Sequence, residues 1–141
     1  MADQKKPRPY AEGTSVPVAN SKAEIERILG RYGADQFMYG IKEGMALIMF
    51  RAHGRHVRFV LPLAKTNEAE ERRRWRCMTL VIKSKLEAVA TGIVEFQDEF
   101  MAHIVMPDGR TVSDHAKPMI ETAYKSGQMH PLLPDYSKKE D

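Results

Sequence analysis

Apolar residues recur at helical spacing shortly after the start of the chain. Their steps of three and four predict one apolar helix face, formed by Ile25, Ile28, Leu29 and Tyr32. Ser21 stands at the expected N-cap position with Glu24 three residues later, which is the pattern of a capping box. Gly33 follows as a typical residue after a helix C-terminus. We therefore predict a helix over residues 21–32.

Three short segments then alternate apolar and polar positions with a period of two, which predicts strands. Lys42-Glu43-Gly44 and His53-Gly54 form the links, and links this short favour an antiparallel meander. The side expected to face the core carries Phe37, Tyr39, Ile41, Ala46, Ile48, Phe50, Val57, Phe59 and Leu61. The opposite side carries Met38, Leu47, Met49, Arg51, His56, Arg58 and Val60. Because this second side is apolar in its middle and basic along one edge, we expect it to be covered by another element or to bind a partner.

A long apolar stripe follows Asn67, which is placed to cap a helix. It runs at steps of three and four from Trp75 to Ile104. One helix over residues 68–104 would be about 55 Å long, which exceeds the diameter of a compact domain of this size. Thr91-Gly92 is the natural break, and the pattern leaves open whether the stretch is one helix or two. A straight helix would need a partner for its far end, most simply a second copy.

The C-terminal part contains a turn and a last helix. Met106-Pro107-Asp108-Gly109-Arg110 has turn composition and predicts a small hairpin over residues 104–111. The last helix is expected to begin at Ser113 or Asp114 and to end at Gly127. The predicted class is therefore α+β: a helix, a three-stranded antiparallel meander, a long and possibly kinked helix, a small hairpin and a C-terminal helix.

Composition and length set the domain organisation. The 141 residues suit a single domain, which we place at residues 20–134, between an extended basic arm at 1–19 and a charged tail at 135–141. The one cysteine rules out an intramolecular disulfide and fits a reducing compartment. No apolar run is long enough for a membrane span, and the N-terminus lacks the apolar segment of a secretory signal. We expect a cytoplasmic protein without membrane contact.

Charge divides unevenly along the chain. Residues 1–90 carry 17 basic and 10 acidic side chains, whereas residues 91–141 carry 5 and 9. This asymmetry favours an anionic partner for the basic part, or opposite charges that meet between copies of an oligomer. The candidate nucleic-acid-binding residues are the arginines of the second hairpin and those of the run after Glu71: Arg51, Arg55, Arg58, Arg72, Arg73, Arg74 and Arg76. The competing interpretation pairs Glu68 with Arg72 and Glu70 with Arg74 on one helix, and places Trp75 in the core.

Catalytic and metal-binding patterns are weak. Cys77 lies inside a predicted helix and belongs to no nucleophile motif. His53 and His56 are close in sequence, but no cysteine or carboxylate accompanies them at ligand spacing. His103 and His115 are isolated. We therefore expect no catalytic residue, no metal and no cofactor. A pocket that gathers Cys77 or a histidine with a carboxylate would argue for an enzyme.

Three stretches resemble a family of uncharacterised small proteins encoded by phages and mobile elements. They are RWRCMTLVIKSKLEAV at residues 74–89, HIVMPDGRT at 103–111 and AYKSGQMHPLLP at 123–134. The resemblance implies a phage or mobile-element protein and no particular activity. The order of elements in residues 21–90 is also similar to that of the double-stranded RNA-binding domain, a likeness of topology alone. That family opens its second helix with a lysine-rich run, where this chain has Glu68-Ala69-Glu70-Glu71.

These observations lead to two expected functions. The first is a non-enzymatic, nucleic-acid-binding accessory protein whose basic surface neutralises phosphates, with DNA and RNA equally open. The second is a protein-binding module, either an inhibitor or adaptor of a host machine or an oligomeric structural component. The mixed second side of the sheet and the opposed charges of the two parts of the chain favour this alternative.

Overall fold

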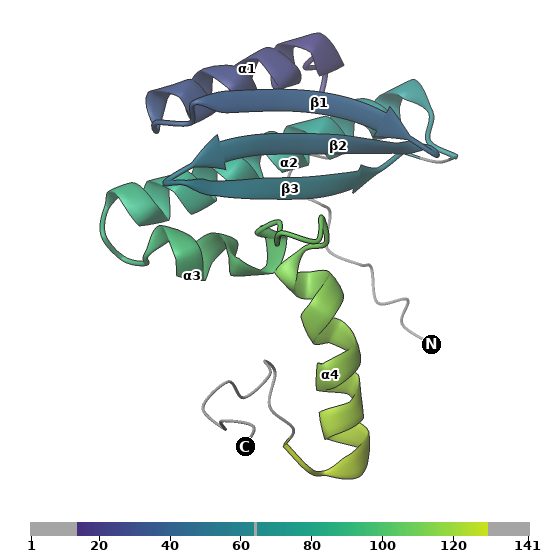
Figure 1. Ribbon diagram of the computed structural model, residues 1–141. Coiled ribbons are helices and arrows are strands. Elements are labelled where there is room, and N and C mark those ends of the chain that lie inside the picture. Colours follow the sequence, from purple (N-terminus) through teal and green to yellow (C-terminus); the bar gives the residue numbers. More distant parts are fainter. Residues whose placement is uncertain (1–13, 64, 130–141) are drawn as a thin grey trace, which may run out of the picture.

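The computed structural model describes residues 14–63 and 65–129 as a sheet with helices on one side. Figure 1 shows α2 behind the strands, α1 along β1 at the top of the view, and α4 leading away from the edge of the sheet at β3. The α+β class predicted from the sequence is confirmed. The elements are α1 (Val18–Arg31), β1 (Gln36–Lys42), β2 (Met45–Ala52), β3 (Arg55–Pro62), α2 (Glu68–Ala90), α3 (Phe96–Phe100), the short 3₁₀ helix η1 (Met101–His103) and α4 (Val112–Ser126).

The sheet is an antiparallel meander in the order β1-β2-β3, as predicted. Both hairpins turn through two residues with positive φ. In the second hairpin these are His53 at 51° and Gly54 at 70°. Such turns match the right-handed twist of the strands, and glycine adopts the second position without steric cost. Short, tight links therefore fix the register of all three strands.

The core lies between the sheet and the two helices. The alternation along the strands predicted its sheet side correctly, except at Ile41. That residue lies next to the β1–β2 turn, near the end of an edge strand, and is 76% exposed. The fully buried helical residues that meet the sheet include Ile25, Leu29, Trp75 and Ile82.

The start of α1 corrects the sequence prediction. The helix begins at Val18, inside the predicted arm, and its N-cap Pro17 makes no side-chain hydrogen bond. Ser21 is fully buried inside the helix, so the predicted capping box is wrong. The hydroxyl of Thr79 on α2 lies 3.3 Å from the carbonyl oxygen of Ser21, so this small residue stands where the two helices meet. The first 13 residues of the arm lie outside the described part of the chain.

The long apolar stripe divides into two helices. Asn67 caps α2 as predicted, because its side-chain oxygen accepts the amide hydrogen bond of Glu70 at 2.8 Å. The helix ends at Ala90, and Gly92 takes a left-handed φ of 77°. The sequence left open whether this stretch is one helix or two, with Thr91-Gly92 as the place for a break. The structure has two helices, which leaves Ile93 82% exposed and turns α3 back onto the core. The described chain therefore has no single straight helix over residues 68–104 whose far end would need a second copy.

The predicted hairpin at residues 104–111 is reduced to isolated bridges. Ile104 bridges Val57, and the amide of Val105 donates to the carbonyl of His56 at 2.8 Å, so this segment extends the sheet beyond β3. Val105 also bridges Thr111, which caps α4 through a capping box with Asp114. The last helix thus begins slightly before the predicted residues, and it ends at Gly127 as predicted. The predicted tail at 135–141 lies outside the described residues.

Candidate interaction face

The side of the sheet turned away from α1 and α2 forms one continuous surface, which we call the outer face. The register places its residues in four rows across the strands, so side chains in a row are direct neighbours. Sequence alternation had identified seven of them. The register adds Gln36, Gly40, Lys42, Met45 and Pro62. The rows are Gln36–Arg51–His56, Met38–Met49–Arg58, Gly40–Leu47–Val60 and Lys42–Met45–Pro62.

The middle of the outer face is apolar and open. Met38 is 59% exposed and Val60 is 45% exposed, while Leu47 and Met49 between them are half-buried. No described helix covers these side chains, and Figure 1 shows the sheet with this face toward the viewer. An antiparallel sheet with one solvated face normally alternates apolar inside with polar outside. The two middle rows depart from that rule at every position except Gly40 and Arg58.

Cations surround the apolar middle, and no carboxylate belongs to the face. Its basic residues are Lys42 at one end and Arg51 and Arg58 toward the other. The Arg51 guanidinium forms a two-pronged ion pair with Asp35, with Nε 2.9 Å from Oδ1 and 3.2 Å from Oδ2. Hydrogen bonding to Arg51 lowers the pKa of Asp35 below its usual value. Arg51 is therefore held at the margin of the face.

Arg58 is held by the segment that leads into α4. Its Nη1 donates to the carbonyl oxygen of Gly109 at 3.0 Å, and its Nη2 lies 3.8 Å from an oxygen of Asp114. The guanidinium thus joins the outer face of β3 to a turn more than fifty residues later in the chain. Because these partners are distant in sequence, no spacing pattern could have predicted the contact. The start of α4 is fixed beside the outer face.

Two carboxylates, Asp108 and Asp114, stabilise the start of α4 when they are ionised. We therefore expect acid to weaken this part of the fold. Backbone and side-chain hydrogen bonds from Thr111 lower the pKa of Asp114, and the backbone amide of Arg110 together with His115 lowers that of Asp108. A carboxyl whose pKa is lowered by folding stabilises the fold above its unfolded pKa and ceases to do so as the pH falls through its folded pKa. We expect the cap of α4 to open below about pH 4. The Thr111 amide chemical shift in a pH titration measures this.

Asp114→Asn is the control for this prediction, because an amide oxygen can still accept hydrogen bonds but does not titrate. In that variant the Thr111 amide should lose most of its acid-dependent shift. A Thr111 amide shift that stays constant between about pH 5 and pH 2 in the unmodified chain would contradict the role given to Asp114.

The arginines at the start of α2 lie apart from the outer face. Arg74 pairs with Glu70 at 3.1 Å, as the sequence predicted, and also donates to the carbonyl oxygen of Pro62 at 2.5 Å. Arg73 pairs with the same Glu70, and Arg76 pairs with Glu24 of α1 at 2.6 Å. Arg72 is half-exposed and has no ion pair within the described residues, so the expected pair with Glu68 is not observed there.

The structure does not bring the two predicted basic clusters together. Arg74 contacts Pro62 at the end of β3, whereas Arg55 lies at its beginning, about 23 Å away at ~3.3 Å per residue. Arg51 and Arg58 point to the outer face, and α2 packs on the inner one. Among the described residues, the side chain of Arg55 makes one hydrogen bond, to the carbonyl oxygen of neighbouring Gly54. A partner that touched both clusters would have to pass around the sheet.

Trp75, in the middle of the arginine run, belongs to the core. It is 1% exposed and lies edge-on to Tyr39, with ring centroids 5.6 Å apart. The amino group of Lys22 lies 4.9 Å from its ring centroid. The side chain is therefore not available for stacking on a base, as the competing interpretation of the run had predicted.

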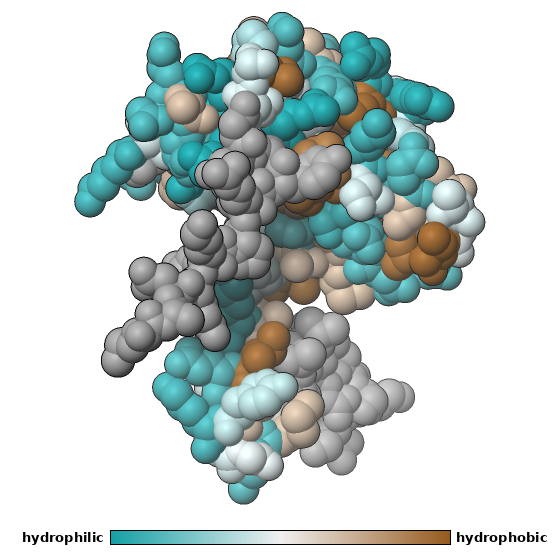
Figure 2. Space-filling model, turned by 180° about the vertical axis from the view of Figure 1, so that it is seen from behind, coloured by the Kyte–Doolittle hydropathy of each residue, from teal (hydrophilic) through white to brown (hydrophobic). Residues whose placement is uncertain are grey.

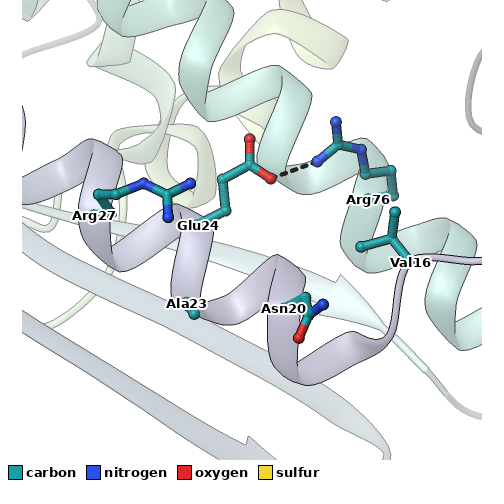
Figure 3. Close-up of a pocket in the computed structure, with 6 residues that line it drawn as sticks. All are labelled: Val16, Asn20, Ala23, Glu24, Arg27 and Arg76. Atoms are coloured by element: carbon teal, nitrogen blue, oxygen red, sulfur yellow. Dashed lines mark hydrogen bonds and ion pairs between the residues drawn. The ribbon is translucent and has the colours of Figure 1, made fainter.

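Neither hollow found on the surface gathers groups for catalysis. The larger, of about 490 Å³, lies between α1 and α2 (Figure 3), where the Glu24–Arg76 ion pair crosses between the helices beside Arg27. The other, of about 300 Å³, contains Cys77 and Glu70, but Glu70 is occupied by two arginines and no histidine lines the hollow.

Two of the histidines pack against aromatic rings of the core, and His115 pairs with Asp108 at 2.7 Å. His53 stacks on Phe96 at 4.6 Å, and His103 packs against Phe59 at 4.2 Å. Burial, followed by the charges of Lys85 and Lys117, lowers the pKa of His103. Within residues 14–63 and 65–129, no three His, Cys, Asp or Glu side chains lie close enough together to hold a metal ion. In the same part of the chain, no helix combines the length and apolarity needed to cross a membrane.

Comparison of the chain with models of known protein families, with curated protein sequences and with solved structures found no match. The resemblance to phage-encoded proteins therefore stays a prediction.

Proposed function

We propose that this chain is a non-enzymatic protein-binding module and that the outer face of its sheet is the binding surface. The observation that carries this proposal is the open apolar middle of that face, with Met38 and Val60 about half exposed on either side of Leu47 and Met49. Monomeric proteins rarely leave contiguous apolar surface in water unless it binds something. A polar margin around an apolar centre is the usual composition of a protein interface.

The chemistry of the face favours protein over single-stranded nucleic acid. Proteins that bind single strands offer aromatic rings on which bases stack. None of the twelve outer-face residues is Phe, Tyr or Trp, and the one ring among them, His56, lies in an end row. The rings of Phe37, Tyr39, Phe50 and Phe59 all lie on the inner side of the sheet. Flexible methionines instead provide a surface that adapts to apolar side chains of a protein partner.

Val60→Glu tests this proposal, with Val81→Glu as the matched control. Val60 is 45% exposed on the outer face and Val81 is 42% exposed on α2, so both variants place a carboxylate at a similarly exposed valine. The measurement is quantitative affinity capture with the tagged chain. The lysate should also contain an untagged copy of the chain, so that a second copy can be captured as well as other proteins. We expect Val60→Glu to capture about tenfold less protein than the unmodified chain, because an interface would bury the new charge. Val81→Glu should capture the unmodified amount. Equal behaviour of the two variants would contradict the proposal, provided both melt like the unmodified chain.

A second candidate function is nucleic-acid binding by the cationic margin of the same face. The observation that favours it is the group of three cations on the face, Lys42, Arg51 and Arg58, together with Arg55 at the hairpin tip. Contacts of this kind would go to phosphates and would be sensitive to salt.

Fluorescence anisotropy with labelled single- and double-stranded DNA and RNA across a salt series tests this candidate. If it holds, the double variant Arg55→Ala, Arg58→Ala should reduce the slope of log K against log salt on duplex DNA by about 1.8, which corresponds to two phosphate contacts. The matched double variant Arg73→Ala, Arg74→Ala should leave the slope unchanged, because those residues lie on the other side of the sheet. No binding even at low salt would exclude this candidate.

A further inference from the structure

The C-terminal helix α4 is amphipathic but buries none of its residues. Its four charged residues apart from histidine lie on one side, at steps of three and four: Asp114, Lys117, Glu121 and Lys125. The other side carries an apolar stripe of Val112, Ala116, Met119, Ile120, Ala123 and Tyr124. Ile120 is 49% exposed and Tyr124 is 87% exposed. Seen from behind (Figure 2), the part of the molecule that α4 forms shows apolar side chains beside hydrophilic ones.

The base of α4 is held firmly although its body leads away from the sheet. The amide of Val112 donates to the carbonyl of Ile104 at 3.0 Å, and Arg58 holds Gly109 from the outer face. Figure 1 shows the rest of α4 extending away from the sheet and helices. A helix of this length is marginal in water without tertiary packing. The described part of the chain therefore presents α4 as a projecting helix whose apolar stripe is most exposed at Ile120 and Tyr124, while its other members are half-buried.

We propose that a second copy of this chain covers both unpartnered surfaces. The α4 of each copy lies with its apolar stripe across the outer face of the other copy, around a two-fold axis. This inference rests on the proposed function, since it uses the same outer face, and it names the partner that the face binds. Such reciprocal contacts are the ordinary form of a two-fold symmetric dimer.

The dimensions of the two surfaces match. A helix of 15 residues is about 22 Å long, and strands of seven or eight residues span about 23–27 Å. Each copy would contribute the twelve outer-face residues and roughly half of α4, which together approach the 20–30 residues per partner of a stable interface. One such contact alone would be small, but reciprocity doubles it.

Charge does not oppose this arrangement. Apart from histidine, α4 carries two acidic and two basic side chains, so it brings no net charge to the cationic outer face of the other copy. The one charged residue in the two middle rows of the face, Arg58, is paired with Asp114 of its own chain, so docking there buries no unpaired charge.

The test measures the dimerisation of two single variants, first each variant alone and then an equal mixture of the two. Val60→Glu alters the outer face and Ile120→Glu alters α4, and sedimentation equilibrium on the full chain measures the dimer dissociation constant. We expect a dimer of the unmodified chain, and a dissociation constant at least about tenfold higher for each variant alone. Val81→Glu should dimerise like the unmodified chain.

Mixing the two variants separates this geometry from other dimers. A mixed dimer would place the intact α4 of Val60→Glu on the intact face of Ile120→Glu, so one of the two contacts survives. The mixture should therefore associate more tightly than either variant alone. If either variant melts early, Met38→Glu on the face or Tyr124→Ser on α4 replaces it, because both residues are more than half exposed.

Three outcomes would overturn the inference: a chain that stays monomeric at about 100 μM, a dimer that Ile120→Glu leaves intact, or no recovery on mixing. These failures are distinguishable from failure of the proposed function. If the chain is monomeric but Val60→Glu still loses proteins that Val81→Glu captures, the outer face binds another protein and only the second copy is excluded.

Discussion

Replacing Phe100 by alanine should lower the free energy of unfolding by about 3–5 kcal/mol, because the substitution leaves a cavity in a rigid aromatic cluster. Phe100 is fully buried. Its ring stacks on Phe96 at 4.6 Å and meets Phe50 and Phe59 edge-on at 5.8 Å and 6.3 Å. Such a loss is a large fraction of the stability of a domain of this size. Urea denaturation followed by circular dichroism measures it.

Phe100 also connects the core to the segment that leads into α4. It is the last residue of α3, and η1 and the Ile104 bridge to β3 follow directly. Phe100→Ala should therefore increase amide hydrogen exchange in residues 101–112 even under conditions where the sheet stays folded. The control is Ile93→Ala, at a position that is 82% exposed, and it should change stability by less than about 0.5 kcal/mol. Equal losses for the two variants would show that Phe100 is not the residue that ties this segment to the core.

Local patterns predicted most of the fold because the signals were local. The strands followed from the period of two, and the hairpins from glycine placed where a tight turn requires positive φ. The break after α2 followed from Gly92, where a left-handed φ of 77° ends the helix. Each of these features depends on residues only a few positions apart, so sequence spacing was enough to predict it.

The errors arose where tertiary contacts outweighed local preference. Ser21 has the sequence context of a capping residue, yet its small side chain is buried where α1 meets α2. Among the described residues its hydroxyl has no hydrogen-bond partner, so this side chain fills the helix contact and does not cap a helix. At the other end of the domain, the expected hairpin is present as the Val105–Thr111 bridge, and the sequence did not predict that Ile104 also bridges β3, a partner almost fifty residues away in the chain.

The candidate surface could be predicted only in part. The alternation in residues 36–62 identified a mixed outer face and left open whether another element covers it. In the structure, no helix of the described residues covers that face. The sequence also suggested that the arginines of the second hairpin and those of α2 form one basic surface. The structure separates them, because Arg55 lies at the start of β3, whereas Arg74 contacts Pro62 at its end. Ion pairs such as Arg51–Asp35 depend on strand register and could not be read from spacing alone.

Trp75→Ala should destabilise the fold by about 3–5 kcal/mol, as expected for a large buried aromatic residue at the contact between α1, α2 and β1. Trp75→Phe should cost less, because it keeps an aromatic ring beside Tyr39 and removes an indole N–H that has no hydrogen-bond partner among residues 14–63 and 65–129. Chemical denaturation of the two variants, followed by circular dichroism, gives both values.

The same residue distinguishes a core role from a recognition role within the arginine run. Trp75 is the single tryptophan of the chain, so its fluorescence reports one environment. At 1% exposure its emission should be blue-shifted and protected from iodide, and it should stay unchanged when oligonucleotides are added. Quenching by a bound oligonucleotide would mean that α2 moves to expose the ring, and the arginines around it would then become the binding surface. Unchanged emission, together with the loss of stability in Trp75→Ala, would assign Trp75 to the packing of α2 and exclude it as a platform for stacking bases.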